Sequence, residues 1–346
     1  SNPPAGVAKL GRWRGYIPEA MTELLVTAQH RFLGLFPHPD DESLGAGILL
    51  QRAARVGAAV LPLFLTSGEG NSWPQRVLDR KLKLEAHDRV RFALRRQGEV
   101  QRALETLGIS PCAAQFLRWP DTQLTQLLLH GGEELVDRLT QEVERFQPTH
   151  LIAPVLADHH PDHSATAVLA FALGQRFPQL RLLGYATHAH LAPQQELAVL
   201  SGSPHEVSTK YRAIQCHTSQ LVFRRRFHLQ FATAREVFYP LTARENRQRL
   251  EARLAEGKLD LYFTPRLSWR CGRTPCLWLV TMDETLTGLR LPLVQKSRWW
   301  QPRVGPWQTV LELPKASPWV LVKVSRPFLL YDEAGFVLAE QAQALG

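Results

Sequence analysis

The sequence has few sulfur-containing residues and no long apolar run, and each shortage excludes a class of protein. Its 346 residues include 2 methionines and only 4 cysteines. Four cysteines are too few for a fold held together by disulfides. Cys271 and Cys276 could pair across a turn, but no second cysteine pair accompanies them to form a zinc site, and we expect free thiols. No apolar run approaches the ~20 residues that a transmembrane helix needs.

The N-terminal residues also lack the apolar core of a secretory signal peptide. We therefore expect a cytoplasmic protein whose membrane contact, where there is any, is peripheral at the inner surface. Lysine and arginine outnumber aspartate and glutamate by 41 to 32, which gives a net charge of +9. This surplus favours an anionic partner such as nucleic acid, an anionic membrane surface or a phosphorylated substrate.

Apolar runs alternate with amphipathic stretches between residues 31 and 257. The runs are typical of buried strands and lie at 31–36, 58–66, 113–119, 149–156 and 180–187. The amphipathic stretches are typical of helices and lie at 44–56, 84–108, 133–146, 163–177 and 242–257. This alternation predicts an α/β fold with a Rossmann-like, mostly parallel sheet flanked by helices.

The sequence changes character after residue 257. Tryptophan becomes frequent, and β-rich runs separated by turn signals lie at 259–263, 276–282, 309–313, 319–324 and 327–332. We predict a smaller, mostly antiparallel β-rich domain at 258–346 that packs against the first and whose role the sequence leaves open. The chain then consists of an N-terminal extension at 1–30, a main domain at 31–257 and this accessory domain.

The stretch LFPHPDDESLG crowds His38, Asp40, Asp41 and Glu42 directly after the first apolar run. Prolines on either side of His38 end the strand and stiffen the turn. In open α/β sheets, ligands bind at the carboxyl ends of the strands, so these side chains should project into a binding crevice. A helix N-cap would explain one of the carboxylates, but not the whole group.

A second cluster follows the run at 149–156. The stretch ADHHPDHSATA offers Asp158, His159, His160, Asp162 and His163, again just before a predicted helix. Two imidazoles and one carboxylate, with a position left for water, are the ligands of a catalytic zinc ion. Because both clusters lie at strand-to-helix junctions on the same edge of a sheet, we predict one metal site between them.

The motif PHPDDESLG resembles the signature of the N-acetylglucosaminylphosphatidylinositol de-N-acetylase-like family, also called PIG-L-like or LmbE-like. HHPDHSATA resembles the second motif of that family. Between them TSGEGN, Arg96, Glu99 and ALETLG match its middle section, and KYRAIQCHTSQ matches its Lys-to-Ser-Gln segment. The resemblance covers roughly 31–245 in the expected order, with Pro37 where the family usually has alanine.

The resemblance implies a zinc-dependent N-deacetylase that holds one metal ion per chain, with iron as the alternative metal. His38, Asp41 and His163 would bind the ion. Asp40, adjacent but not a ligand, would be the general base that activates the attacking water.

Four further residues receive roles from the same resemblance. His160 would stabilise the oxyanion or protonate the leaving amine, and Asp162 would hold His160 in the right tautomer. Arg96 would reach a substrate hydroxyl or phosphate, unless it is simply solvated. Glu42 would support the ligands from behind, contact the substrate side of the site or cap the helix.

The implied reaction removes the N-acetyl group of an N-acetylhexosamine of the GlcNAc or GalNAc type and releases acetate. The positive charge favours a substrate that is anionic or lipid-linked, such as a glycolipid or a lipopolysaccharide precursor. The candidate basic contacts are Arg96, Lys210, Arg212 and the arginines at 224–226.

Two alternatives remain from the sequence. The first is a zinc amidase with the same catalytic residues that acts on a thiol–sugar conjugate of the mycothiol or bacillithiol type. The second is a non-catalytic carbohydrate- or nucleic-acid-binding protein, which the charge and the tryptophans favour. The two intact clusters and the lack of an RNP-type signature make nucleic acid the weaker partner. The oligomeric state is left open.

Overall fold

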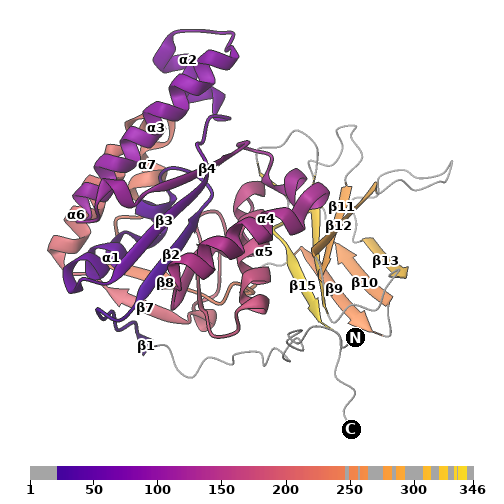
Figure 1. Cartoon of the computed structure of the whole chain (residues 1–346). Helices are drawn as coiled ribbons and strands as arrows, with labels where there is room; N and C mark the ends of the chain where they lie inside the picture. Colours follow the sequence, from indigo (N-terminus) through magenta and orange to yellow (C-terminus); the bar gives the residue numbers. More distant parts are fainter. Residues whose placement is uncertain are drawn as a thin grey trace, which may run out of the picture.

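The computed structural model describes residues 22–245, 249–255, 258–263, 276–282, 286–292, 307–312, 319–325, 331–332 and 334–340 (Figure 1). Its helices are α1 (Asp41–Val56), α2 (Ser72–Asp79), α3 (Ala86–Thr106), α4 (Leu124–Phe146), α5 (Pro161–Arg176), α6 (Pro204–Cys216) and α7 (Thr218–Leu229). Its strands are β1 (Thr22–Glu23), β2 (Arg31–Phe36), β3 (Ala59–Thr66), β4 (Gln115–Trp119), β5 (His150–Pro154), β6 (Arg181–Tyr185), β7 (Ala198–Ser201), β8 (Arg235–Phe238), β9 (Leu250–Ala255), β10 (Lys258–Phe263), β11 (Cys276–Met282), β12 (Leu286–Pro292), β13 (Trp307–Glu312), β14 (Trp319–Ser325) and β15 (Val337–Glu340).

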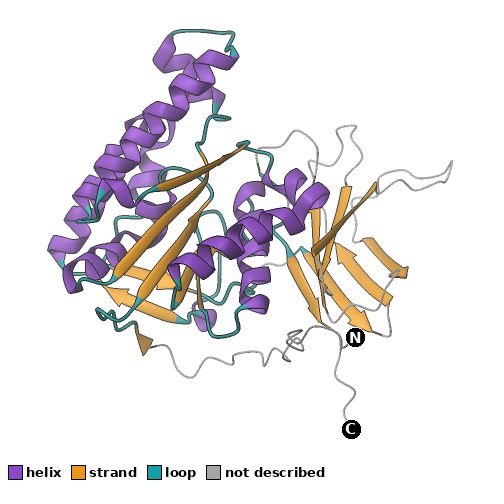
Figure 2. Ribbon diagram, viewed as in Figure 1, coloured by secondary structure: helices purple, strands orange, loops and turns teal. Residues whose placement is uncertain are grey.

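A five-stranded sheet in the order β4-β3-β2-β5-β6 forms the centre of the molecule (Figure 2). Its strand pairings are all parallel, and its strands coincide with the apolar runs of the sequence. The predicted α/β class, with a mostly parallel sheet flanked by helices, is therefore confirmed. Within the described ranges, no helix is both long and apolar enough to cross a bilayer.

The two faces of the sheet carry different helices. Leu33 and Leu35 of β2 share a core with side chains of α4 and α5, whereas Phe32 and Phe36 share another with side chains of α1 and α3. This is the two-residue alternation of a strand buried on both faces. Gly57 ends α1 in the left-handed region with φ 72°, as expected for a helix C-cap.

The C-terminal β-rich region forms two antiparallel sheets, β12-β11-β14-β15 and β13-β10-β9. Trp278 of β11 and Trp319 of β14 enter the same core as α4 and α5. The Trp319 ring meets Phe171 of α5 edge to face, with ring centroids 4.9 Å apart. The β-rich region is thus packed against helices α4 and α5, which cover one face of the main sheet. Of the run predicted at 327–332, residues 327–330 lie outside the described part of the chain.

The helix predicted at 242–257 is wrong. Residues 250–255 form strand β9, which pairs antiparallel with β10, so that Leu254 lies opposite Leu259. Leu250 and Leu254 are four residues apart, a spacing that places two side chains on one face of either a helix or a strand. Pairing with β10 resolves the ambiguity. The proposed domain division at 257 falls within this hairpin.

The structure tests the prediction of free thiols for two of the four cysteines. Cys112 and Cys216 are free thiols. Cys271 lies outside the described residues, so its pairing with Cys276 stays untested.

Candidate metal centre

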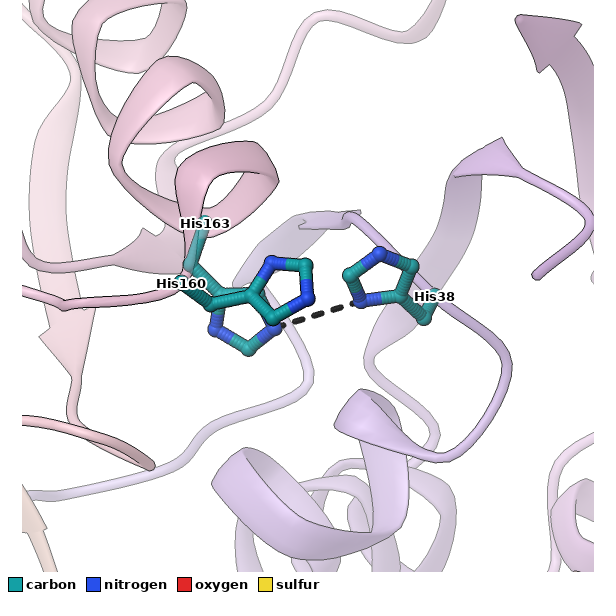
Figure 3. Close-up of side chains that lie close together, drawn as sticks. All are labelled: His38, His160 and His163. Carbon is teal, nitrogen blue, oxygen red and sulfur yellow. Dashed lines mark hydrogen bonds between the residues drawn. The ribbon is translucent and has the colours of Figure 1, made fainter. Parts of the chain in front are cut away.

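The two His/Asp clusters come together because their strands are neighbours. His38, Asp40 and Asp41 follow β2, His160 and His163 follow β5, and β2 pairs directly with β5. All five line one cavity of about 660 Å³. This is the carboxyl edge of the parallel sheet, where ligands bind in open α/β folds. Figure 3 shows the three imidazoles meeting from the two elements.

Three donor atoms in this cavity form a nearly equilateral triangle. The Nδ1 of His38 lies 3.3 Å from the Nε2 of His163. The Oδ2 of Asp41 lies 3.5 Å from the former nitrogen and 3.4 Å from the latter. Ligand bonds of 2.0–2.2 Å in a tetrahedral site place donor atoms about 3.3–3.6 Å apart. The three residues therefore fit a single metal ion.

The other nitrogen of each imidazole is held from behind. The Nε2 of His38 lies 3.1 Å from Asp121 and 3.2 Å from Asp162. The Nδ1 of His163 lies 3.0 Å from the Thr187 hydroxyl and 3.4 Å from Asp158. Such partners fix the ring orientation and increase the basicity of a ligating imidazole.

The charges around the triangle favour a cation. Burial lowers the pKa of His38, but Asp121, Asp162 and Asp41 outweigh burial and raise that pKa well above its ordinary value. Burial likewise lowers the pKa of His163, which Asp41 and Asp158 raise overall. Carboxylates that would hold both rings protonated create a strongly negative potential. A divalent metal ion is suited to that potential and to these ligands.

Two other groups of possible ligands include His38: one with His160 and His163, and one with Asp121 and Asp162. The second of these groups meets the Nε2 of His38, on the side of the ring away from the triangle. Both oxygens of Asp162 already accept main-chain N–H groups, from Leu124 at 3.0 Å and Thr122 at 2.7 Å. Both oxygens of Asp121 do the same, from Gly70 and Thr122. These carboxylates are therefore better suited to orienting His38 than to binding the ion.

His160 lies beside the triangle, with its ring centroid 4.7 Å from that of His38 and 5.0 Å from that of His163. Its Nδ1 accepts the main-chain N–H of Asp162 at 3.2 Å, which leaves the proton on Nε2. Burial, together with the charges of His38 and His163, lowers its pKa well below the ordinary value. Asp162 thus contacts His160 through its main chain, whereas its carboxylate contacts His38.

Asp40 has a backbone conformation that residues other than glycine rarely adopt, with φ 134°. Its surroundings hold it there, because its N–H donates to Glu42 at 3.0 Å and Arg96 donates to the Pro39 carbonyl. Its Oδ2 lies 3.3 Å from Arg96 and 3.6 Å from His228. Burial raises the pKa of Asp40, but Arg96 and His228 outweigh burial and hold that pKa below its usual range. The carboxylate is therefore ionised at neutral pH.

Two residues predicted to contact substrate, Glu42 and Arg96, form their hydrogen bonds with other groups of the protein. Glu42 is 0% exposed, and its oxygens accept from the Asp40 N–H, the Ser43 hydroxyl and His217, so it supports the loop and does not reach substrate. Arg96 is 3% exposed and donates to the carbonyls of Gly68 and Pro39 besides pairing with Asp40. It lines the cavity wall, but these contacts make it a positioning residue for Asp40 and not a solvated arginine.

Residues 33–173 match a family model described as PIG-L, GlcNAc-PI de-N-acetylase. This segment is therefore similar to the PIG-L family. It contains His38, Asp40 and Asp41 in the first cluster, and His160 and His163 in the second.

Part of the chain is also similar to curated proteins. A 1D-myo-inositol 2-acetamido-2-deoxy-α-D-glucopyranoside deacetylase from Corynebacterium urealyticum is 32% identical over 154 residues, which are 39% of this chain and 45% of that protein. The Mycobacterium avium enzyme of the same name is 30% identical over 150 residues, 38% of this chain and 47% of its own. The chain thus spans about half the length of these relatives. A Pyrococcus horikoshii N,N'-diacetylchitobiose deacetylase structure aligns at 20% identity and a TM-score of 0.45, covering 60% of this chain and 82% of that one.

Three aspartate or histidine residues of the cavity wall were not among the predicted site residues. Asp121 follows β4 and His188 follows β6, so the rule that ligands bind at strand ends points to both. His228 lies on α7, beyond the matched segment, and no local pattern singles it out. Its position beside Asp40 depends on how α7 packs.

Proposed function

We propose that this chain is a metal-dependent hydrolase that removes the N-acetyl group of an amino sugar. The observation that carries the proposal is the donor triangle of His38, Asp41 and His163, with Asp40 and His160 in the same cavity. The curated relatives are named as deacetylases of an acetamido-glucopyranoside of inositol, which supports an N-acetylated glucoside as the substrate class.

Each residue has a role that follows from its surroundings. A zinc ion held by the triangle, or iron in its place, would lower the pKa of a water molecule and polarise the amide carbonyl. Asp40, kept ionised by Arg96 and His228, would accept a proton from the attacking water. The C–N bond breaks, the water oxygen stays on the acyl carbon as acetate, and the proton that Asp40 accepted passes to the departing nitrogen.

His160 would act on the other side of the reacting carbonyl. Because its Nδ1 accepts a main-chain N–H, its Nε2–H is available to donate to the oxyanion or to the departing amine. A neutral imidazole in this tautomer needs no further proton to serve as donor.

His160→Ala is expected to lower the rate of acetate release by about 10²–10³, the usual effect of removing an oxyanion donor. The metal should remain bound, which metal analysis of the purified variant would check. His130→Ala, an exposed histidine on α4, provides the matched control. Loss of metal from His160→Ala would make His160 a ligand and place the role of His163 in doubt.

The substrate is further proposed to be anionic or lipid-linked and to be met from the cytoplasmic side. Arg224 lies at the cavity wall next to two exposed apolar side chains, Trp73 at 65% and Phe223 at 52% exposure. Basic and apolar groups together suit an amphiphilic, negatively charged substrate or a membrane surface. Lys210 does not contribute, because it is buried against Glu236 with Nζ and Oε2 2.6 Å apart.

The test compares acetate release from neutral N-acetylglucosamine with release from phosphorylated and lipid-linked N-acetylglucosamine across ionic strength. Rates on the anionic substrates should exceed those on the neutral sugar and fall as salt screens the basic rim. Equal turnover of the neutral sugar, without salt dependence for either substrate, would remove the anionic proposal and leave the deacetylase intact. Release of acetate from none of these compounds would remove both.

A further inference from the structure

One aromatic side chain of the catalytic cavity comes from the C-terminal β-rich region. Tyr331 lies between β14 and β15, far beyond the matched segment 33–173, and yet it lines the same cavity as the donor triangle. Its ring meets that of His160 edge-on, with centroids 5.7 Å apart, and that of His188 at 5.0 Å. The β-rich region therefore reaches the imidazole proposed to donate a hydrogen bond to the reacting amide.

The main chain around Tyr331 is anchored to the loop that carries His160. The N–H of Asp332 donates to the His159 carbonyl at 2.8 Å, and the N–H of Phe336 donates to the Leu156 carbonyl at 2.7 Å. Gly335 permits this close approach, since a Cβ there would come within 2.2 Å of the Leu156 oxygen. Because the anchors lie on both sides of the catalytic loop, the position of Tyr331 is coupled to that of His160.

A buried charge strengthens the anchor. Lys323 of β14 is 0% exposed, and its Nζ lies 2.5 Å from Asp332 and 2.7 Å from the Ser164 hydroxyl of α5. An ammonium group buried in this way needs both partners, so the residue after Tyr331 is tied to the helix that carries His163.

The outer end of Tyr331 is held by Arg224. The guanidinium donates to the Tyr331 hydroxyl and lies 5.5 Å from the ring centroid. Arg224 also packs over Phe227, whose ring stacks on His188 at 5.2 Å. The Tyr331 ring thus extends from the catalytic imidazole toward exposed Arg224, along the wall of the cavity that holds the triangle.

We propose that Tyr331 is a specificity-determining residue, and that the β-rich region completes the active site by presenting it to the group attached to the amino sugar. This inference rests on the proposed deacetylase function. A tyrosine suits such a group because its ring offers an apolar surface and its hydroxyl a hydrogen bond. The group recognised is the aglycone of the N-acetylated sugar, and the inositol in the compounds named for the curated relatives serves as the probe for it.

The experiment measures kcat and KM of the full, metal-loaded chain for N-acetylglucosamine and for its inositol glycoside. The wild type should prefer the glycoside, and Tyr331→Ala should reduce that preference by about 10-fold or more through KM, the usual effect of one lost contact. Tyr331→Phe keeps the ring and should retain part of the preference. Metal content should stay unchanged in both variants, and Tyr262→Ala, an exposed tyrosine of β10, is the control.

The possible outcomes separate the two proposals. A wild type that releases no acetate from either compound, nor from phosphorylated or lipid-linked N-acetylglucosamine, overturns the deacetylase function and this inference with it. An active wild type with no preference for the glycoside overturns the inference alone. The inference is also overturned if Tyr331→Ala changes neither substrate, or slows both equally, because an equal loss is the effect of a purely structural residue.

Discussion

Asp41→Ala is expected to lose the bound metal and, with it, all measurable acetate release. The substitution removes one of three donor atoms that lie 3.3–3.5 Å apart and leaves two imidazoles to hold the ion. It also removes the acceptor of the His38 main-chain N–H at 2.9 Å, which helps to shape the turn. Elemental analysis of purified protein after dialysis, alongside the acetate assay, measures both effects.

The matched control for Asp41→Ala is Asp137→Ala. Asp137 is an exposed carboxylate on α4 that pairs with Arg176, so its removal should change neither metal content nor rate. Full metal occupancy together with normal activity in Asp41→Ala would show that other residues hold the ion.

Asp40→Asn is expected to keep the metal and to lower the rate of acetate release about 10²–10⁴-fold, the usual contribution of general acid–base catalysis. The amide of asparagine has nearly the same shape as the carboxylate, but it cannot accept the proton of the attacking water. Asparagine also tolerates positive φ better than most residues, so the strained turn at 134° should survive. Pre-steady-state and steady-state acetate release, with metal analysis, would measure the effect.

Two results would contradict this assignment of Asp40. A near wild-type rate in Asp40→Asn would show that another group is the base. Loss of metal would show that Asp40 belongs to the ligands and not beside them. Asp137→Asn makes the same chemical change on an exposed surface and should behave as wild type.

The parallel sheet and the two clusters could be predicted from the sequence because each depends on residues that are close together in the chain. The run at 31–36 and the run at 149–156 are apolar enough to be buried strands, and each is followed at once by a His/Asp cluster and a helix. Parallel strands place their carboxyl ends at one edge of the sheet, so neighbouring strands bring the clusters together. The resemblance of PHPDDESLG and HHPDHSATA to one family added the expected roles.

Strand β9 shows why some elements could not be predicted from short stretches of the sequence. Leu250 and Leu254 share a face in a helix and in a strand alike, so the apolar spacing around them could not decide between the two. The decision comes from β10, whose backbone pairs with residues 250–255. Such pairing is a property of two segments, and no single window of sequence contains it.

The burial of charged side chains could not be predicted from the sequence either. Arg96 and Lys210 are long, flexible cations that a sequence places on a surface by default. Each is buried here because a carboxylate distant in the chain meets it, Asp40 in one case and Glu236 in the other. Burial of a charge depends on such a partner, and the partner is supplied by the fold.

Local patterns of the sequence were enough to predict the α/β class, the parallel sheet and the two clusters that follow two of its strands, since hydrophobic period and turn residues act over a few positions. The distances of 3.3–3.5 Å between the donor atoms of His38, Asp41 and His163 come from the folded structure. The folded structure also brings Tyr331 of the β-rich region to the same cavity. Distances between side chains of different elements follow from packing across the whole chain, which no local pattern encodes.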